Sequence, residues 1–183
     1  IESGQVIDVD EKLTVEAWVK DSGSYNGAIF GKHENSSRRW HIYLWHPDEL
    51  VYWNIGGENW GESNLSELGT DWHHLAMVYD GAGSNNSERL KAYVDGEMIS
   101  LDFGSRTIPS SMPDISANFM MGTNGDGNFF SGRLDEVRVH KRALSTQEIK
   151  ASHSNSVYRL YQNFTSLAQG TYDYSAYVID ETG

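Results

Sequence analysis

The chain has 183 residues, a formal net charge of −12 at pH 7 and no cysteine, and this length fits one ordinary domain. The absence of cysteine excludes disulfides, thiol catalysis and thiolate metal sites, and the negative charge disfavours nucleic acid and anionic membranes as partners. No apolar run approaches the roughly 18 residues that a membrane-spanning helix needs, so we expect a globular domain that does not insert into a membrane.

Short runs of alternating apolar and polar residues, separated by clusters of Gly, Asn, Asp and Ser, make up most of the first 140 residues. A period of two is typical of strands. The predicted strands are Leu13–Lys20, Ala28–Lys32, Arg39–Trp45, Leu50–Ile55, Trp72–Tyr79, Leu90–Val94, Asn118–Gly122 and Leu134–His140. Tight hairpins are predicted at His46–Glu49 and Val94–Glu97, where Asp95-Gly96 suits a type I′ turn. Many short strands without intervening helices predict an all-β fold, an antiparallel two-sheet jelly-roll sandwich.

A capping box, Ser145 with Glu148, predicts one short helix near residues 145–152. The polar residues Ser152–Ser156 that follow suggest a linker. Two alternating runs beyond this stretch predict a β-hairpin. Because a lone hairpin is barely stable in water, residues 153–183 are expected either to pack on the sandwich or to begin an immunoglobulin-like module.

Four segments carry motifs in a fixed order: LTVEAWVK at Leu13–Lys20, DWHHLAMVYDG at Asp71–Gly81, KAYVDG at Lys91–Gly96 and FSGRLDEVRVH at Phe130–His140. In this order and spacing they resemble the laminin-G-like, concanavalin-A-like jelly-roll family of surface and secreted proteins. The resemblance covers Val6 to Lys150. It implies one domain over residues 1–152 that lies outside the cell or on its surface, within a larger protein. The implied role is non-catalytic, either adhesion to a cell-surface protein or glycan binding.

Two neighbouring predicted strands, Arg39–Trp45 and Leu50–Ile55, each have one apolar face and one face that mixes aromatic with polar residues. The apolar faces are expected in the core. Aromatic rings beside hydrogen-bonding groups suit sugars, whose C–H faces stack on rings while their hydroxyls need partners. Trp60, on a glycine-rich loop at residues 56–61, is expected to add a platform at the rim. The predicted ligand-binding residues are His41, Tyr43, Trp45, Tyr52, Asn54 and Trp60. The alternative is that a loop, the C-terminal hairpin or a neighbouring domain covers this face.

Two segments suggest a structural Ca²⁺, which prefers six to eight oxygen ligands. The resemblance implies that Asp135 binds the ion together with loop carbonyls; alternatively, it bonds loop amides or pairs with Arg133 or Arg138. Residues 124–128 place three oxygen-bearing side chains at alternate positions, although a glycine-rich turn explains the same residues. Glu136 and Arg138 are expected to pair with each other. The predicted metal ligands are Asp135, Asn124, Asp126 and Asn128.

Four Asn-x-Ser/Thr sequons support a glycosylated, extracellular protein. The predicted glycosylation sites are Asn35, Asn64, Asn85 and Asn163. The seven histidines show no metal-ligand spacing, and His73 and His74 are expected on opposite faces of one strand.

Related sandwiches include glucanases that carry a carboxylate pair on one strand as E-x-D-x-[x]-E. Glu16, Asp135 and Glu136 do not reproduce this motif, so we expect a protein that is not an enzyme. Two rival interpretations remain. One is a structural module that self-associates in a surface filament or layer and has no ligand of its own, and the less favoured one is a glucanase-type hydrolase.

Overall fold

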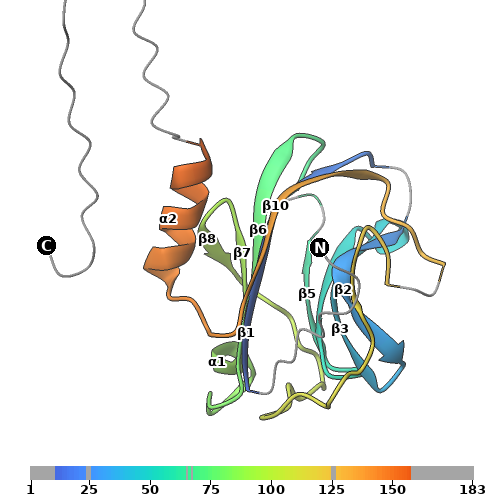
Figure 1. Cartoon of the computed structure of the whole chain (residues 1–183), viewed down its shortest axis with the longest axis vertical. Coiled ribbons are helices and arrows are strands. Elements are labelled where there is room, and N and C mark those ends of the chain that lie inside the picture. Colours follow the sequence, from blue (N-terminus) through green and yellow to red (C-terminus); the bar gives the residue numbers. More distant parts are fainter. Residues whose placement is uncertain (1–10, 24–25, 65, 67, 125–126, 158–183) are drawn as a thin grey trace, which may run out of the picture.

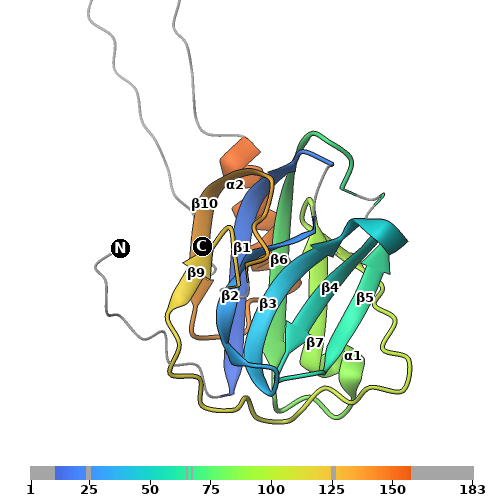
Figure 2. The same cartoon turned by 90° about the vertical axis from the view of Figure 1, so that its right-hand side faces the viewer.

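The computed structural model describes residues 11–157 except 24–25, 65, 67 and 125–126. Its strands form two antiparallel sheets of five strands each (Figure 1), which confirms the predicted all-β jelly-roll sandwich. The back sheet has the strand order β10 (Gly132–His140), β1 (Lys12–Asp21), β6 (Trp72–Asp80), β7 (Leu90–Val94) and β8 (Glu97–Ile99). The front sheet, which faces the viewer in Figure 2, has the order β5 (Trp60–Asn64), β4 (Leu50–Ile55), β3 (Arg38–Trp45), β2 (Gly27–Asn35) and β9 (Phe119–Met121).

The core lies between the two sheets and follows the alternation of each strand. It includes Val15 of β1 and Met77 of β6. The inward-pointing side chains of β3 and β4 are at most 1% exposed; they are Trp40, Ile42, Leu44, Val51, Trp53 and Ile55. Burial of one such side chain stabilises the fold by about 1.5–3 kcal/mol. The prediction that the apolar faces form the core is therefore confirmed, and the mixed faces point away from it.

The front sheet contains a strand that the sequence pattern did not predict. Trp60 begins β5 and pairs with Asn54 of β4, so its expected place on a loop is wrong. Glycine and asparagine are poor strand formers, and the short run from Trp60 to Asn64 contains both, so pairing with β4 decides its conformation. A Cβ at Gly61 would lie 2.8 Å from Leu101 Cδ1, which explains the glycine. The short strand β8 and the one-turn helix α1 (Asn86–Arg89) were not predicted either.

Both predicted hairpins are confirmed. β3 and β4 are joined by a short 3₁₀-helix, η1 (His46–Asp48), followed by Glu49 with φ of 54°. Between β7 and β8, Asp95 and Gly96 have φ values of 51° and 78°. Positive φ at both central positions is the signature of a type I′ turn, which matches the twist of the strands that it joins.

Helix α2 (Thr146–Val157) lies on the outer side of the back sheet (Figure 1). Its capping box is formed, since the amide of Glu148 donates to Ser145 Oγ at 3.3 Å and the amide of Ser145 donates to Glu148 Oε2 at 2.8 Å. Ile149 is fully buried in a cluster with Tyr93 of β7. This packing stabilises a helix longer than its sequence signal, so the expected linker at Ser152–Ser156 is wrong, because these residues belong to α2.

The predicted C-terminal hairpin falls on residues 158–183, which lie outside the described residues, and it stays a prediction. Within the described part of the chain, no helix has the length and apolar character needed to cross a membrane.

Candidate functional site

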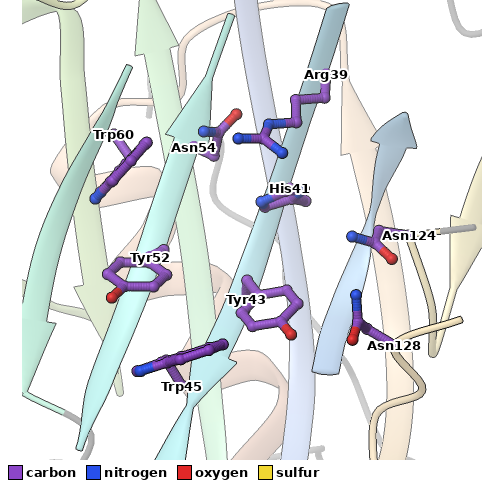
Figure 3. A pocket seen from close by; sticks show the side chains of 9 residues that line it. All are labelled: Arg39, His41, Tyr43, Trp45, Tyr52, Asn54, Trp60, Asn124 and Asn128. Carbon is purple, nitrogen blue, oxygen red and sulfur yellow. The ribbon is translucent and has the colours of Figure 1, made fainter. Parts of the chain in front are cut away.

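The outward face of the front sheet carries a pocket of about 360 Å³. Strands β3, β4 and β5 supply most of its wall, and the loop after β9 supplies one side (Figure 3). The lining residues are Arg39, His41, Tyr43, Trp45, Tyr52, Asn54, Trp60, Asn124 and Asn128. All six predicted ligand-binding residues are therefore brought together, and their binding role stays a prediction.

Strand register explains why these side chains share one face. His41 lies opposite Asn54, and Tyr43 lies opposite Tyr52. Asn54 in turn lies opposite Trp60. Directly paired residues on an antiparallel sheet have side chains on the same face, about 4.5–5.5 Å apart at Cβ. Alternation along each strand and pairing between strands together place these side chains on one continuous surface of the sheet.

The aromatic rings on this surface form a continuous row. Ring centroids are separated by 5.7 Å from His41 to Tyr43, 6.3 Å from Tyr43 to Trp45, 6.5 Å from Trp45 to Tyr52 and 5.6 Å from Tyr52 to Trp60. These spacings are in the range in which aromatic pairs attract one another. Within this row Trp45, Tyr52 and Trp60 are half-buried and so partly open to a ligand, whereas His41 and Tyr43 are buried.

The two tryptophans of the row are held by hydrogen bonds at their indole nitrogens. Trp45 Nε1 donates to Asp48 Oδ2 at 3.0 Å, and Trp60 Nε1 donates to Glu62 Oε1 at 2.8 Å. Arg106 lies 3.9 Å above the Trp60 ring and pairs with Glu62 at 2.9 Å. A side chain fixed before binding loses less entropy when a ligand arrives, so both indoles are preorganised.

One end of the pocket is polar. Arg39 Nε and Asn54 Nδ2 both donate to the carbonyl oxygen of Gly57, at 3.1 and 2.7 Å. Two polar atoms here, Asn54 Oδ1 and His41 Nδ1, are buried without a hydrogen-bond partner among the described residues. Such atoms are costly in a fold until they are paired.

The protonation state of His41 is set by its surroundings at this end. Burial, together with the positive charge of Arg39 and the proximity of His33, lowers the pKa of His41 to about 3. His41 is therefore neutral at physiological pH. Burial, with the carboxylates of Glu62 and Asp48, raises the pKa of Tyr52 above its ordinary value, so its phenol keeps its proton.

Arg39 was not among the predicted site residues, although the sequence contained the signal. Arg39 precedes His41 by two positions on β3, so period-two alternation places both on one face. The contribution of Asn124 and Asn128 had no such signal, because the fold of the loop after β9 brings them to the pocket wall.

The residues predicted to bind calcium are distributed over two places. Asn124 and Asn128 line the aromatic pocket, whereas Asp126 lies outside the described residues. Asp135 is exposed, and its Oδ1 accepts a hydrogen bond from the Glu136 amide at 2.8 Å. No group of three or more His, Asp or Glu suited to a metal occurs in the described ranges. Calcium binding stays a prediction.

Other predicted contacts are present. Glu136 pairs with Arg138 at 2.6 Å, as expected. His73 and His74 point to opposite faces of β6, since His73 contacts Asp95 at 2.7 Å whereas His74 is buried. Three sequon asparagines, Asn35, Asn64 and Asn85, are exposed. Asn163 lies outside the described residues, and glycosylation stays a prediction at all four positions.

The chain is similar to known proteins in both sequence and fold. The model of the family described as the concanavalin A-like lectin/glucanases superfamily matches residues 1–150. No curated protein matches the chain. Among solved structures, the carbohydrate-binding module CBM40 of the Ruminococcus gnavus IT-sialidase, bound to α2,3 sialyllactose, matches with a TM-score of 0.59 and 17% identity, over 79% of this chain and 84% of that chain.

Two further structures show the same architecture in other settings. A heptameric SAP-like pentraxin from Limulus polyphemus matches with a TM-score of 0.51 and 20% identity, over 80% of this chain and 72% of that chain. Trypanosoma rangeli sialidase matches with a TM-score of 0.59 and 16% identity, over 80% of this chain but only 23% of the enzyme. At these identities the likeness concerns the fold alone.

Proposed function

Because the chain belongs to the concanavalin A-like lectin/glucanase superfamily, we propose that it is a non-catalytic module that binds a glycan in the pocket of the front sheet. The observation that carries the proposal is the row of five rings, His41 to Trp60, bordered by the amides of Asn54, Asn124 and Asn128. Rings stack on the C–H faces of a sugar, and amides both donate to and accept from its hydroxyls.

The dimensions of the pocket agree with this ligand class. Its volume of about 360 Å³ falls within the range of about 300–1,000 Å³ that small-ligand sites occupy. The likeness to a Ruminococcus gnavus module solved with sialyllactose adds support, since a sandwich of the same architecture binds an oligosaccharide there.

A hydrolase is disfavoured by the composition of the wall. Most glycoside hydrolases need two carboxyl groups on either side of the scissile bond, and none of the nine described lining residues is Asp or Glu. The nearby carboxylates of Asp48 and Glu62 accept hydrogen bonds from Trp45 and Trp60 and so serve to position indoles. The match to Trypanosoma rangeli sialidase covers less than a quarter of that enzyme.

A glycan array tests the proposal. The wild-type chain is compared with Trp45→Ala and Tyr52→Ala, and with Trp72→Ala as a matched control, because Trp72 is an exposed tryptophan on the back sheet. We expect binding to at least one glycan class, a loss of about tenfold or more in each pocket variant, and unchanged binding in the control. Binding to no glycan, or binding that both pocket variants retain, would contradict the proposal.

The remaining parts of the proposal concern context. We expect the module to act in adhesion outside the cell within a larger surface protein, and protease accessibility of this segment on intact cells tests the location. The alternative, a structural module of a filament or layer, predicts ordered self-association, which light scattering at rising concentration detects. The hydrolase alternative predicts release of reducing ends from β-glucans.

A further inference from the structure

We propose that the sugar in this pocket carries a carboxylate, and that Arg39 is the residue that recognises it. This inference rests on the proposed glycan-binding function and names the chemical class of its ligand. Arg39 lines the pocket, and its Nε donates to the Gly57 carbonyl at 3.1 Å. Within the described ranges it forms no ion pair, whereas neighbouring Arg38 pairs with Glu34 at 3.3 Å and Arg106 pairs with Glu62 at 2.9 Å.

An arginine without a carboxylate partner is informative in this particular chain. The sequence has 26 acidic residues and 14 lysines and arginines, so carboxylates outnumber the cations that could pair with them. Arg39 is nevertheless left with a hydrogen bond to a neutral carbonyl at the wall of a pocket. A half-buried guanidinium forms its strongest hydrogen bonds with an ionised partner that displaces water when it binds. A ligand carboxylate is such a partner.

The geometry of Arg39 suits a carboxylate in particular. The Nε hydrogen bond to Gly57 restrains the guanidinium plane and leaves the two terminal nitrogens without a partner among the described residues. In Figure 3 the guanidinium lies over His41 and beside Asn54, at the end of the pocket opposite Trp45. A planar fork of two N–H groups matches the two oxygens of a carboxylate and forms a bidentate pair.

The charges around the pocket give the ligand one orientation. Arg39 is the one formal cation among the nine described lining residues, because His41 is neutral at physiological pH. Asp48 holds Trp45 at the end of the pocket opposite Arg39, whereas Glu62 is paired with Arg106 at 2.9 Å. An acidic group is therefore attracted to the Arg39 end and repelled from the Asp48 end, while the uncharged body of the sugar lies along Trp45 and Tyr52.

Matched pairs of oligosaccharides that differ only in the acidic group test this inference by calorimetry. One pair is 3′-sialyllactose with lactose, and another is a glucuronic-acid-terminated disaccharide with its glucose-terminated counterpart. We expect the wild-type chain to bind the acidic member of at least one pair about tenfold to a hundredfold more tightly. Arg39→Gln should remove this preference by lowering the affinity for the acidic member far more than the affinity for the neutral member, and Arg39→Lys should retain only part of it. Arg38→Gln removes the same charge one residue away and should change nothing.

The outcomes separate this inference from the proposed function. Equal binding of acidic and neutral members, or a preference that Arg39→Gln retains, overturns the inference while glycan binding itself stands. Binding of no oligosaccharide overturns both. If Arg39→Gln fails to fold, salt dependence of the wild type decides: an acid preference that weakens as NaCl is raised supports the ion pair, and one that salt leaves unchanged overturns it.

Discussion

Glu16 of β1 is the most deeply buried carboxylate in the described chain, and we predict that its ionisation stabilises the fold. Its side chain is 1% exposed beneath α2. Ser152 Oγ donates to Glu16 Oε1 at 2.8 Å, and His74, His140 and Arg138 place nitrogens 3.4–3.5 Å from its two oxygens. Three strands and one helix therefore meet at this single carboxylate.

The magnitude follows from the pKa of Glu16. Burial alone would raise this pKa. Hydrogen bonds from His74 and Ser152 and the electrostatic interaction with His74 outweigh the effect of burial, and the pKa falls from 4.5 to about 2. A depressed pKa means that the folded state holds the proton less tightly than the unfolded state. The stabilisation is therefore present above pH 4.5 and is lost as the pH falls through 2. One pKa unit corresponds to about 1.4 kcal/mol, so the full effect is about 3 kcal/mol, of which about 2 kcal/mol disappears between pH 5 and pH 3.

Urea unfolding of the wild-type chain and Glu16→Gln at a series of pH values measures this effect. Glu34, Asp80, Glu88 and Glu148 also have lowered pKa values, but they contribute equally to both proteins. The difference in unfolding free energy between the two proteins should therefore shrink by about 2 kcal/mol from pH 5 to pH 3. A difference that stays constant over this range would show that the carboxylate is not held in its ionised form, and the reasoning would fail.

Three further predictions concern single features. If Asp135 binds a structural calcium ion, EDTA lowers the melting temperature and Asp135→Ala removes that dependence; a melting curve that EDTA leaves unchanged excludes a significant ion. Gly31→Ala should destabilise the front sheet by about 1–3 kcal/mol, because a Cβ there would lie 2.3 Å from the Trp40 carbonyl oxygen; unchanged urea denaturation would contradict this packing. Ser145→Ala removes the capping partner of the Glu148 amide and should cost about 1 kcal/mol, whereas Ser145→Asp, measured in the same way, should retain most of the stability.

The period-two alternation of apolar and polar residues was sufficient to predict the sandwich and most of the pocket residues. On β3 and β4, alternation separates Trp40 and Trp53, which are buried in the core, from Tyr43 and Tyr52, which line the pocket. This separation depends only on the backbone of a strand, so the sequence contains it. The type I′ turn at Asp95-Gly96 was predictable for the same reason, because its positive φ values favour these residues.

The features that the sequence did not reveal depend on contacts between elements. β5 consists of residues with weak strand preference and is specified by its pairing with β4. The loop after β9 brings Asn124 and Asn128 to the pocket wall, although their spacing suggested calcium ligands. The later turns of helix α2 contact the back sheet through polar and aromatic side chains, since Ser152 donates to Glu16 and His153 stacks on Trp18. In each case the conformation depends on pairing or packing with another element, which the local alternation of the segment itself does not contain.

The two outward faces of this sandwich differ in how their charged groups are paired, and the difference favours the front sheet as the place where an acidic ligand binds. On the back sheet, α2 covers Thr14 and Glu16, whose side chains are at most 1% exposed although they point away from the core. Thr14 Oγ1 donates to the Arg142 carbonyl at 2.8 Å and accepts from the Leu144 amide at 2.9 Å, so the segment that leads into α2 is anchored as well. The protein thus supplies partners for Thr14 and for Glu16 Oε1, although Glu16 Oε2, Trp18 Nε1 and both ring nitrogens of His74 have no hydrogen-bond partner among the described residues. The front sheet likewise has unpartnered atoms, Asn54 Oδ1 and His41 Nδ1, but it also leaves Arg39 without an ion pair in the described chain, whereas Arg138 on the back sheet pairs with Glu136 at 2.6 Å. Since hydrogen bonds to an ionised partner are the strong ones, a charged ligand gains most where the fold has left a cation without a carboxylate, which is the Arg39 end of the pocket on the front sheet.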